Sequence, residues 1–451
     1  MDYLFSVIFL LLNFYSYQFG MNSIVFLLLS AALFFGMYYF SFKRTGSFLV
    51  ASMIVMCHTW QASWTDVFGV NYAMKVNGMQ ITWFYITGAC ILLYFILNIK
   101  DVVSKPLPPV PLGMFFAWIV IMLYPLFISP SITEGLKELL VTGFFFVLAF
   151  IAFMFSGKAS AECREYVVDA YIFNMTVTSA FLILQFVVYK ASGVLLFASR
   201  IGSYFGGTVF NAYLLMGDTS SSTIFIAAAM FFVLERLNKN NWLKYVSIAL
   251  ILMVGLAATT RRTSIVTLCP FLIMYSFLHF KEVSKKVVLA VLSVVLIAVM
   301  LYYLSMTRSI TNIDALLYDN GRFSGYRESL EILKNNIFGV GYDNVNLLNM
   351  MSQCVVHNTF LRWLNMGGIP YFIVTISLVV YFVVVSYKRT IKTEFWFLLY
   401  AFVASNLIPD LMAARIAVLP VMMVFIISDK GETVSEESSA VQSRDMLQSR
   451  V

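Results

Sequence analysis

PYFIVTISLVVYFVVVSY, residues 370–387, is a stretch of 18 residues without a single charged side chain. A helix of this length and apolarity can cross the hydrocarbon core of a bilayer. Basic residues follow it at once, beginning with Lys388 and Arg389, and a long polar segment, 306–369, separates it from another apolar run at 287–305. The stretch therefore predicts a membrane-spanning helix with a basic loop at one end and a large loop at the other.

The rest of the chain has the same character. Of its 451 residues, 61% are hydrophobic and only 12% are charged, whereas soluble globular chains carry about 25% charged residues. The composition excludes a soluble globular protein, and no basic domain indicates a nucleic-acid partner. We expect one all-α polytopic membrane domain, 1–428, with about fourteen transmembrane helices. They are expected near 3–19, 22–42, 47–62, 81–99, 111–129, 139–156, 167–189, 220–236, 244–260, 263–280, 287–305, 370–387, 395–409 and 411–428.

Basic residues fall on alternate connections between these spans. Because positively charged loops stay in the cytoplasm, this pattern predicts that both termini are cytoplasmic and that 306–369 is a large external loop with short helices. The polar tail, 429–451, is expected to be a disordered cytoplasmic extension. The residues that set this orientation are Lys43, Arg44, Lys100, Lys105, Lys158, Arg164, Arg236, Lys239, Lys244, Lys281, Lys285, Lys286, Lys388, Arg389 and Lys392.

A second group of cations lies on the predicted outer face, against this bias. An arginine guanidinium binds phosphate through paired, charge-assisted hydrogen bonds, so these positions indicate an anionic substrate. The alternatives are that Arg261 and Arg262 reach lipid headgroups and that Arg327 forms an exposed salt bridge with Glu331. The group consists of Lys190, Arg200, Arg261, Arg262, Arg308, Arg322, Arg327, Arg362 and Arg415.

The external loop contains two segments with the pattern of short helices. The first follows Gly321, is expected to be capped by Ser324, and should end before the glycines of 338–342. The second begins at His357 and should re-enter the membrane at Pro370. A histidine there could act as a general base or bind a phosphate or a sugar hydroxyl; a purely structural histidine is the alternative. The sequence has no cluster at metal-ligand spacing, so we expect neither a metal nor a cofactor.

In this order, the elements resemble the O-antigen polymerase and O-antigen ligase superfamily of bacterial membrane glycosyltransferases. His357-Asn358, Gly368 and Tyr371 match a ligase-type H-N-x9-G-x-x-Y signature. Residues 322–341 are similar to the arginine-containing helix of the family and its "lfGvG" turn. Arg262-Thr263 is similar to the "SRT" element, with arginine where serine is usual. The resemblance covers about 200–371.

The resemblance implies a helical enzyme that transfers glycans from undecaprenyl pyrophosphate at the periplasmic face of the bacterial inner membrane, without metal. His357 would act at the reacting hydroxyl or the phosphate, and Asn358 would orient His357. The expected partners are undecaprenyl-pyrophosphate-linked oligosaccharides, membrane lipid, a chain-length regulator and a flippase. The pyrophosphate would be held by Arg200, Arg261, Arg262, Arg322 and Arg327.

Three functions are compatible with these features. The span count and the composition of the loops favour an O-antigen polymerase, which joins lipid-linked repeat units. An O-antigen ligase, which transfers the same donor to lipid A-core, is slightly favoured by the histidine signature. A lipid-linked oligosaccharide flippase, from another class, predicts charges deep inside several spans and short loops. The charges gather on one face and in one long loop, which disfavours the flippase. Between the two enzymes, the span count and the loop composition lead us to favour the polymerase.

Overall fold

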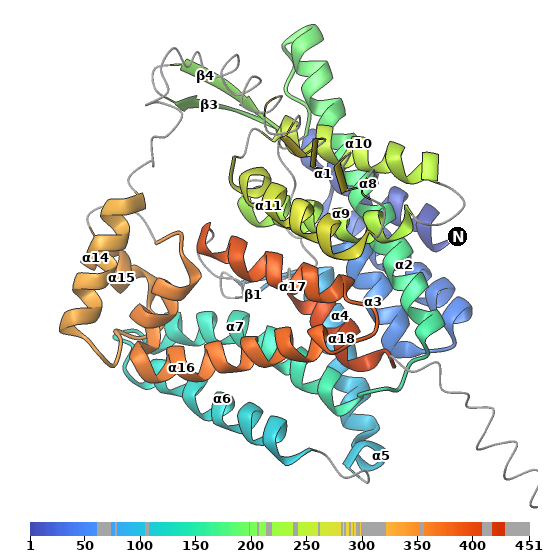
Figure 1. The fold of residues 1–451 in the computed structure, drawn as a ribbon. Helices are drawn as coiled ribbons and strands as arrows, with labels where there is room; N and C mark the ends of the chain where they lie inside the picture. The colour runs from blue at the N-terminus through green and yellow to red at the C-terminus, as the bar shows by residue number, and fades with distance from the viewer. Residues whose placement is uncertain are drawn as a thin grey trace, which may run out of the picture.

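The chain is predominantly helical (Figure 1). The computed structural model describes residues 1–60, 74–76, 79–103, 108–197, 199–204, 207–212, 219–237, 242–259, 262–280, 322–351, 356–407 and 417–428, with short pieces between 283 and 298. Five helices in these ranges are long and apolar enough to cross a membrane, as the sequence predicted. They are α2 (Ser23–Thr45), α6 (Pro109–Phe127), α7 (Ile132–Met154), α8 (Ala161–Ser192) and α16 (Thr359–Tyr387).

Shorter helices occupy most of the other expected spans. The expected span at 287–305 lies mostly outside the described residues, so the count of about fourteen remains a prediction. Helix α17 runs directly into the 3-10 turn η1 (Ser405–Leu407), and the expected interruption at Pro409-Asp410 lies outside the described residues. The shorter helices are α1 (Asp2–Phe19), α3 (Phe48–Thr59), α4 (Trp83–Leu97), α5 (Ile99–Val103), α9 (Thr219–Arg236), α10 (Trp242–Ala258), α11 (Arg262–His279), α17 (Thr393–Ala404) and α18 (Val418–Ile426).

Two small antiparallel hairpins accompany the helices, and the structure remains consistent with the expected all-α membrane protein. Strand β1 (Met74–Val76) pairs with β2 (Met79–Ile81), and β3 (Arg200–Tyr204) pairs with β4 (Gly207–Asn211). The sequence held a signal for the first hairpin. Its two strands flank Asn-Gly, a dipeptide that favours the left-handed backbone of a tight hairpin turn.

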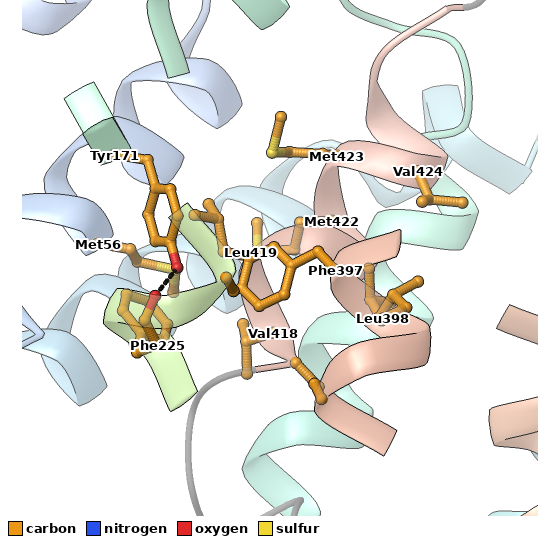
Figure 2. Close-up of a cluster of buried hydrophobic side chains, with 14 of the residues drawn as sticks. Met56, Tyr171, Phe225, Phe397, Leu398, Val418, Leu419, Met422, Met423 and Val424 are labelled. Carbon is orange, nitrogen blue, oxygen red and sulfur yellow. Dashed lines mark hydrogen bonds between the residues drawn. The ribbon is translucent and has the colours of Figure 1, made fainter. Parts of the chain in front are cut away.

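The core is built of interlocking aromatic and aliphatic side chains from helices far apart in the sequence. Figure 2 shows Met56 of α3, Tyr171 of α8, Phe225 of α9 and Phe397 of α17 meeting the side chains of α18. The Tyr171 hydroxyl donates to the carbonyl oxygen of Phe225. A hydroxyl buried without a partner would cost several kcal/mol, so this bond allows tyrosine to serve as a core residue.

Connections that the charge pattern assigns to the cytoplasm meet at one end of the helix bundle, here called the basic end. Arg44 pairs with Asp2 at 2.8 Å, which joins the end of α2 to the start of α1. Arg164 at the start of α8 contacts Glu235 at the end of α9 and Glu394 at the start of α17. These contacts support the predicted alternation of the helices, whereas the side of the membrane that this end faces remains a prediction.

The opposite end, here called the loop end, carries α14 (Arg322–Asn335) and α15 (Asn344–Met350). Figure 1 shows both helices at the edge of the molecule farthest from the N-terminus. The large loop and the start of α16 therefore lie together, away from the basic end.

Candidate functional site

Helix α14 is packed against α16 through polar as well as apolar contacts. The Asn365 side-chain amide donates to the Ser329 hydroxyl at 2.6 Å, and both side chains are fully buried. The Tyr326 hydroxyl donates to the carbonyl oxygens of His357, at 3.3 Å, and Asn406, at 3.2 Å. The helix begins at Arg322, so Ser324 lies in its first turn and is not the cap that the sequence predicted. An apolar cluster of Ile332, Val340, Leu347, Met351 and Val356 completes the contact.

A break in α16 receives the glycine turn that follows α14. At Gly368 the backbone has φ 67° and ψ −165°, which interrupts the helix, and Pro370 has no N–H to donate. The carbonyl oxygens of Asn365 and Met366 consequently lose their partners within the helix. They accept instead from the amides of Val340 at 2.8 Å and Gly341 at 2.9 Å. The turn and the break therefore satisfy each other's backbone groups.

Gly368 is required by this arrangement for two reasons. A residue with a side chain rarely adopts its backbone conformation, and a Cβ atom there would lie 2.2 Å from the carbonyl oxygen of Ile337. We expect Gly368→Ala to cost at least about 1–3 kcal/mol and to release the glycine turn. Thermal unfolding in detergent measures the loss of stability, and limited proteolysis of the loop measures the release of the glycine turn. Gly113→Ala, at a helical site with open space around the Cβ position, is the control. Equal unfolding temperatures and equal proteolysis of the two variants would contradict the requirement for glycine at position 368.

Tyr342 anchors the turn to the helix bundle. Its ring is fully buried, its hydroxyl donates to the carbonyl oxygen of Met122 in α6 at 2.8 Å, and its amide donates to the Ser129 hydroxyl at 2.8 Å. The ring also meets Tyr371 edge-on, with 6.2 Å between centroids. The tyrosine of the signature is therefore a buried packing residue beside the turn.

Asn358 caps α16. Its side-chain oxygen accepts from the amides of Phe360 at 3.0 Å and Leu361 at 3.1 Å, and its side-chain nitrogen donates to the Asn406 side chain at 3.2 Å. The sequence predicted that Asn358 would orient His357. In the structure, both ends of its side-chain amide fix the backbone immediately after His357, and an effect on the histidine side chain remains a prediction. Asn358 is thus a positioning residue.

This role makes Asn358 replaceable by another cap. We expect Asn358→Ala to lower the free energy of unfolding by about 1 kcal/mol. Asn358→Asp should lose less, because aspartate accepts from the same two amides although it cannot donate to Asn406. Thermal unfolding of the two variants side by side makes the comparison. Equal losses in both variants would show that the cap contributes nothing.

The predicted cations do not all approach His357. Arg327 is exposed, two positions from buried Ser329 and on the face of α14 turned away from α16. The salt bridges among the described residues do not include the alternative pair of Arg327 with Glu331. The Arg327 guanidinium therefore remains available to solvent or to a ligand, and its approach to His357 remains a prediction.

The other predicted arginines are placed only by their backbones. Arg322 begins α14, Arg262 begins α11 and Arg200 begins β3; their side chains, and all of Arg261, lie outside the described residues. Figure 1 shows β3 and β4 well apart from α14. Arg200 therefore belongs to a different region from the loop helices, and the convergence of Arg262, Arg322 and His357 remains a prediction.

One charged pair at the loop end was missed by the sequence interpretation. The Arg362 guanidinium on α16 contacts the carboxylate of Glu138 on α7, and both side chains are largely buried. This cation, which the sequence predicted to lie on the outer face, is therefore paired within the protein. Glu138 lies more than 200 positions before Arg362, so no local pattern could have connected them.

Within the described ranges, no three His, Cys, Asp or Glu side chains come together in a way that could hold a metal ion. No family model matches the chain, and no curated protein matches it either.

Proposed function

We propose that the chain is an O-antigen (surface polysaccharide) polymerase of the bacterial inner membrane, with both termini in the cytoplasm. It would join undecaprenyl-pyrophosphate-linked repeat units at the periplasmic face. One observation carries the proposal: the elements of the sequence resemblance are interlocked. The helix that begins at Arg322, the turn at 339–341 and the segment from His357 to Tyr371 hold one another through hydrogen bonds and shared apolar contacts at the loop end.

The proposed reaction is a glycosyl transfer between two lipid-linked substrates. A hydroxyl group of the incoming repeat unit attacks the anomeric carbon of the growing chain, and the bond from that carbon to the pyrophosphate oxygen breaks. The hydroxyl proton passes to a base, for which His357 is the candidate. The pyrophosphate leaves on its lipid, and arginine side chains stabilise the charge that develops on it.

The arrangement of His357 supports this role. Its carbonyl oxygen is held by Tyr326, and the following residue is fixed as the cap of α16. The His357 side chain is partly exposed, so a substrate can approach it. A base held by a rigid backbone can meet a substrate hydroxyl without first being ordered.

Deletion of the gene in its own organism tests the proposal. Surface lipopolysaccharide, separated on a silver-stained gel, should show core capped by a single repeat unit, and the wild-type gene should restore the ladder. Bare core with polymer accumulating on the lipid carrier would identify a ligase. An unchanged ladder would contradict both enzymatic assignments and favour the flippase or another glycan.

A further inference from the structure

A cavity of about 790 Å³ lies at the basic end, opposite the loop end. It is formed between α11, the end of α16, the connection that follows α16, and α17, with Glu235 of α9 at its side. Its volume is in the range of small-molecule sites, about 300–1,000 Å³. No step of the proposed glycosyl transfer uses this cavity.

The inner wall of the cavity is rigid and aromatic. His279 stacks on Tyr275 with 4.3 Å between ring centroids, and its Nδ1 lies 3.2 Å from the carbonyl oxygen of Tyr275. The Trp396 indole N–H points to Nε2 of His279 at 3.4 Å. If Trp396 donates to Nε2, the proton of a neutral imidazole resides on Nδ1. These contacts hold the three rings in place without a ligand.

The outer wall is apolar and exposed. Leu278 is 68% exposed, Tyr387 54% and Met274 41%. In a membrane-spanning protein, exposed apolar side chains at a helix end face lipid chains.

The edge of the cavity carries a cation, Lys392, that could bind an anionic group. The ammonium group of Lys392 lies 4.3 Å from the centre of the Tyr387 ring at the cavity edge. The ion pairs among the described residues include none to Lys392. The carboxylate that lines the cavity, Glu235, is held by both terminal nitrogens of Arg164, at 2.9 and 2.8 Å, and by the Thr393 hydroxyl. The Glu235 carboxylate is therefore held within the protein, in a network in which Arg164 also binds Glu394, whereas Lys392 is the cation at the edge of the cavity.

We propose that this cavity binds one anionic phospholipid. The phosphate would lie beside Lys392, and an acyl chain would run along Met274 and Leu278. Basic pockets between transmembrane helices at the cytoplasmic side are suited to anionic headgroups, and the charge pattern predicts that the basic end is cytoplasmic. The lipid would hold α11 and α17 together at the end opposite the proposed site.

Lipid binding to the full-length protein tests the proposal. Protein stripped of lipid in mild detergent is titrated with phosphatidylglycerol or with phosphatidylcholine, and retained lipid is counted by native mass spectrometry. We expect one phosphatidylglycerol per chain and weaker retention of phosphatidylcholine. Lys392→Gln should weaken phosphatidylglycerol binding about fivefold, the effect of about 1 kcal/mol for one basic residue near an anionic headgroup.

Two further variants keep the result decisive. Leu278→Trp, at an exposed position on the cavity wall, should lower retention of phosphatidylglycerol by filling the space for the acyl chain. Lys43→Gln, at an exposed lysine in the last turn of α2, should leave binding unchanged. Equal retention of the two lipids, equal weakening by Lys43→Gln and Lys392→Gln, or no effect of Leu278→Trp would overturn the proposal.

Discussion

His357→Ala is expected to reduce the lipopolysaccharide ladder to core carrying a single repeat unit, at an unchanged level of protein in the membrane. Loss of a general base lowers a reaction rate by about 10²–10⁴-fold, which is sufficient to prevent processive extension of a surface polymer. The fold should survive, because alanine keeps the backbone contacts that hold this segment: the His357 carbonyl oxygen accepts from Tyr326, and Asn358 caps the helix. Alanine leaves these backbone groups in place.

Two matched measurements separate chemistry from structure. Thermal unfolding of His357→Ala in detergent should be close to that of the wild type, whereas Gly368→Ala should be clearly destabilised. His357→Gln, which can hydrogen-bond but cannot take up a proton at neutral pH, should be as inactive as alanine if the histidine is a base. A full ladder from His357→Ala would exclude any catalytic role for this residue.

Arg164→Leu is expected to give the largest loss of stability of any single change described for this chain. The Arg164 side chain is 1% exposed, its Nε lies 2.5 Å from the Glu394 carboxylate, and its terminal nitrogens bind Glu235. Glu394 itself is fully buried. Removal of one partner from a buried ion pair costs about 3–5 kcal/mol, because the remaining charge has no compensation. Here two carboxylates would be left facing each other.

The loss should appear as a large decrease in the unfolding temperature. Size-exclusion chromatography of heated samples measures this temperature. Arg164→Lys should be intermediate, since an ammonium group cannot reproduce the forked contacts of a guanidinium. Lys388→Leu, at an exposed position on the same end, should change the stability by less than about 0.5 kcal/mol. Wild-type stability of Arg164→Leu would mean that the network contributes nothing to the fold.

The membrane helices could be predicted from sequence because each needs only a local apolar run. The predicted helix ends were less accurate, since α14 begins two residues before its expected cap. The two hairpins were not predicted. Propensity and hydropathy describe a segment by itself, whereas strand pairing depends on a turn and on the surroundings. The Asn-Gly between β1 and β2 was the local signal that could have been used.

Roles that depend on distant partners could not be predicted. Arg164 was interpreted as a residue that sets topology, yet it joins carboxylates 71 and 230 positions away. Asn358 was assigned to His357, although an asparagine before a helix is also a cap signal. Gly368 came from a family resemblance, and the structure supplies its physical reason: the break in α16 that accepts the glycine turn. Neither hydropathy nor the spacing of residues in the sequence indicates any of these contacts.

Purified protein in lipid nanodiscs, supplied with the lipid-linked repeat unit extracted from its own deletion strain, tests the central claim most directly. The measurement is the length of the glycan on the lipid, by mass spectrometry, together with the undecaprenyl pyrophosphate released. We expect glycans of two or more repeat units and one released lipid pyrophosphate for each linkage formed, with neither product from His357→Ala. Repeat units that remain single with the wild-type protein, and that are transferred to lipid A-core when this acceptor is added in a parallel reaction, would contradict a polymerase.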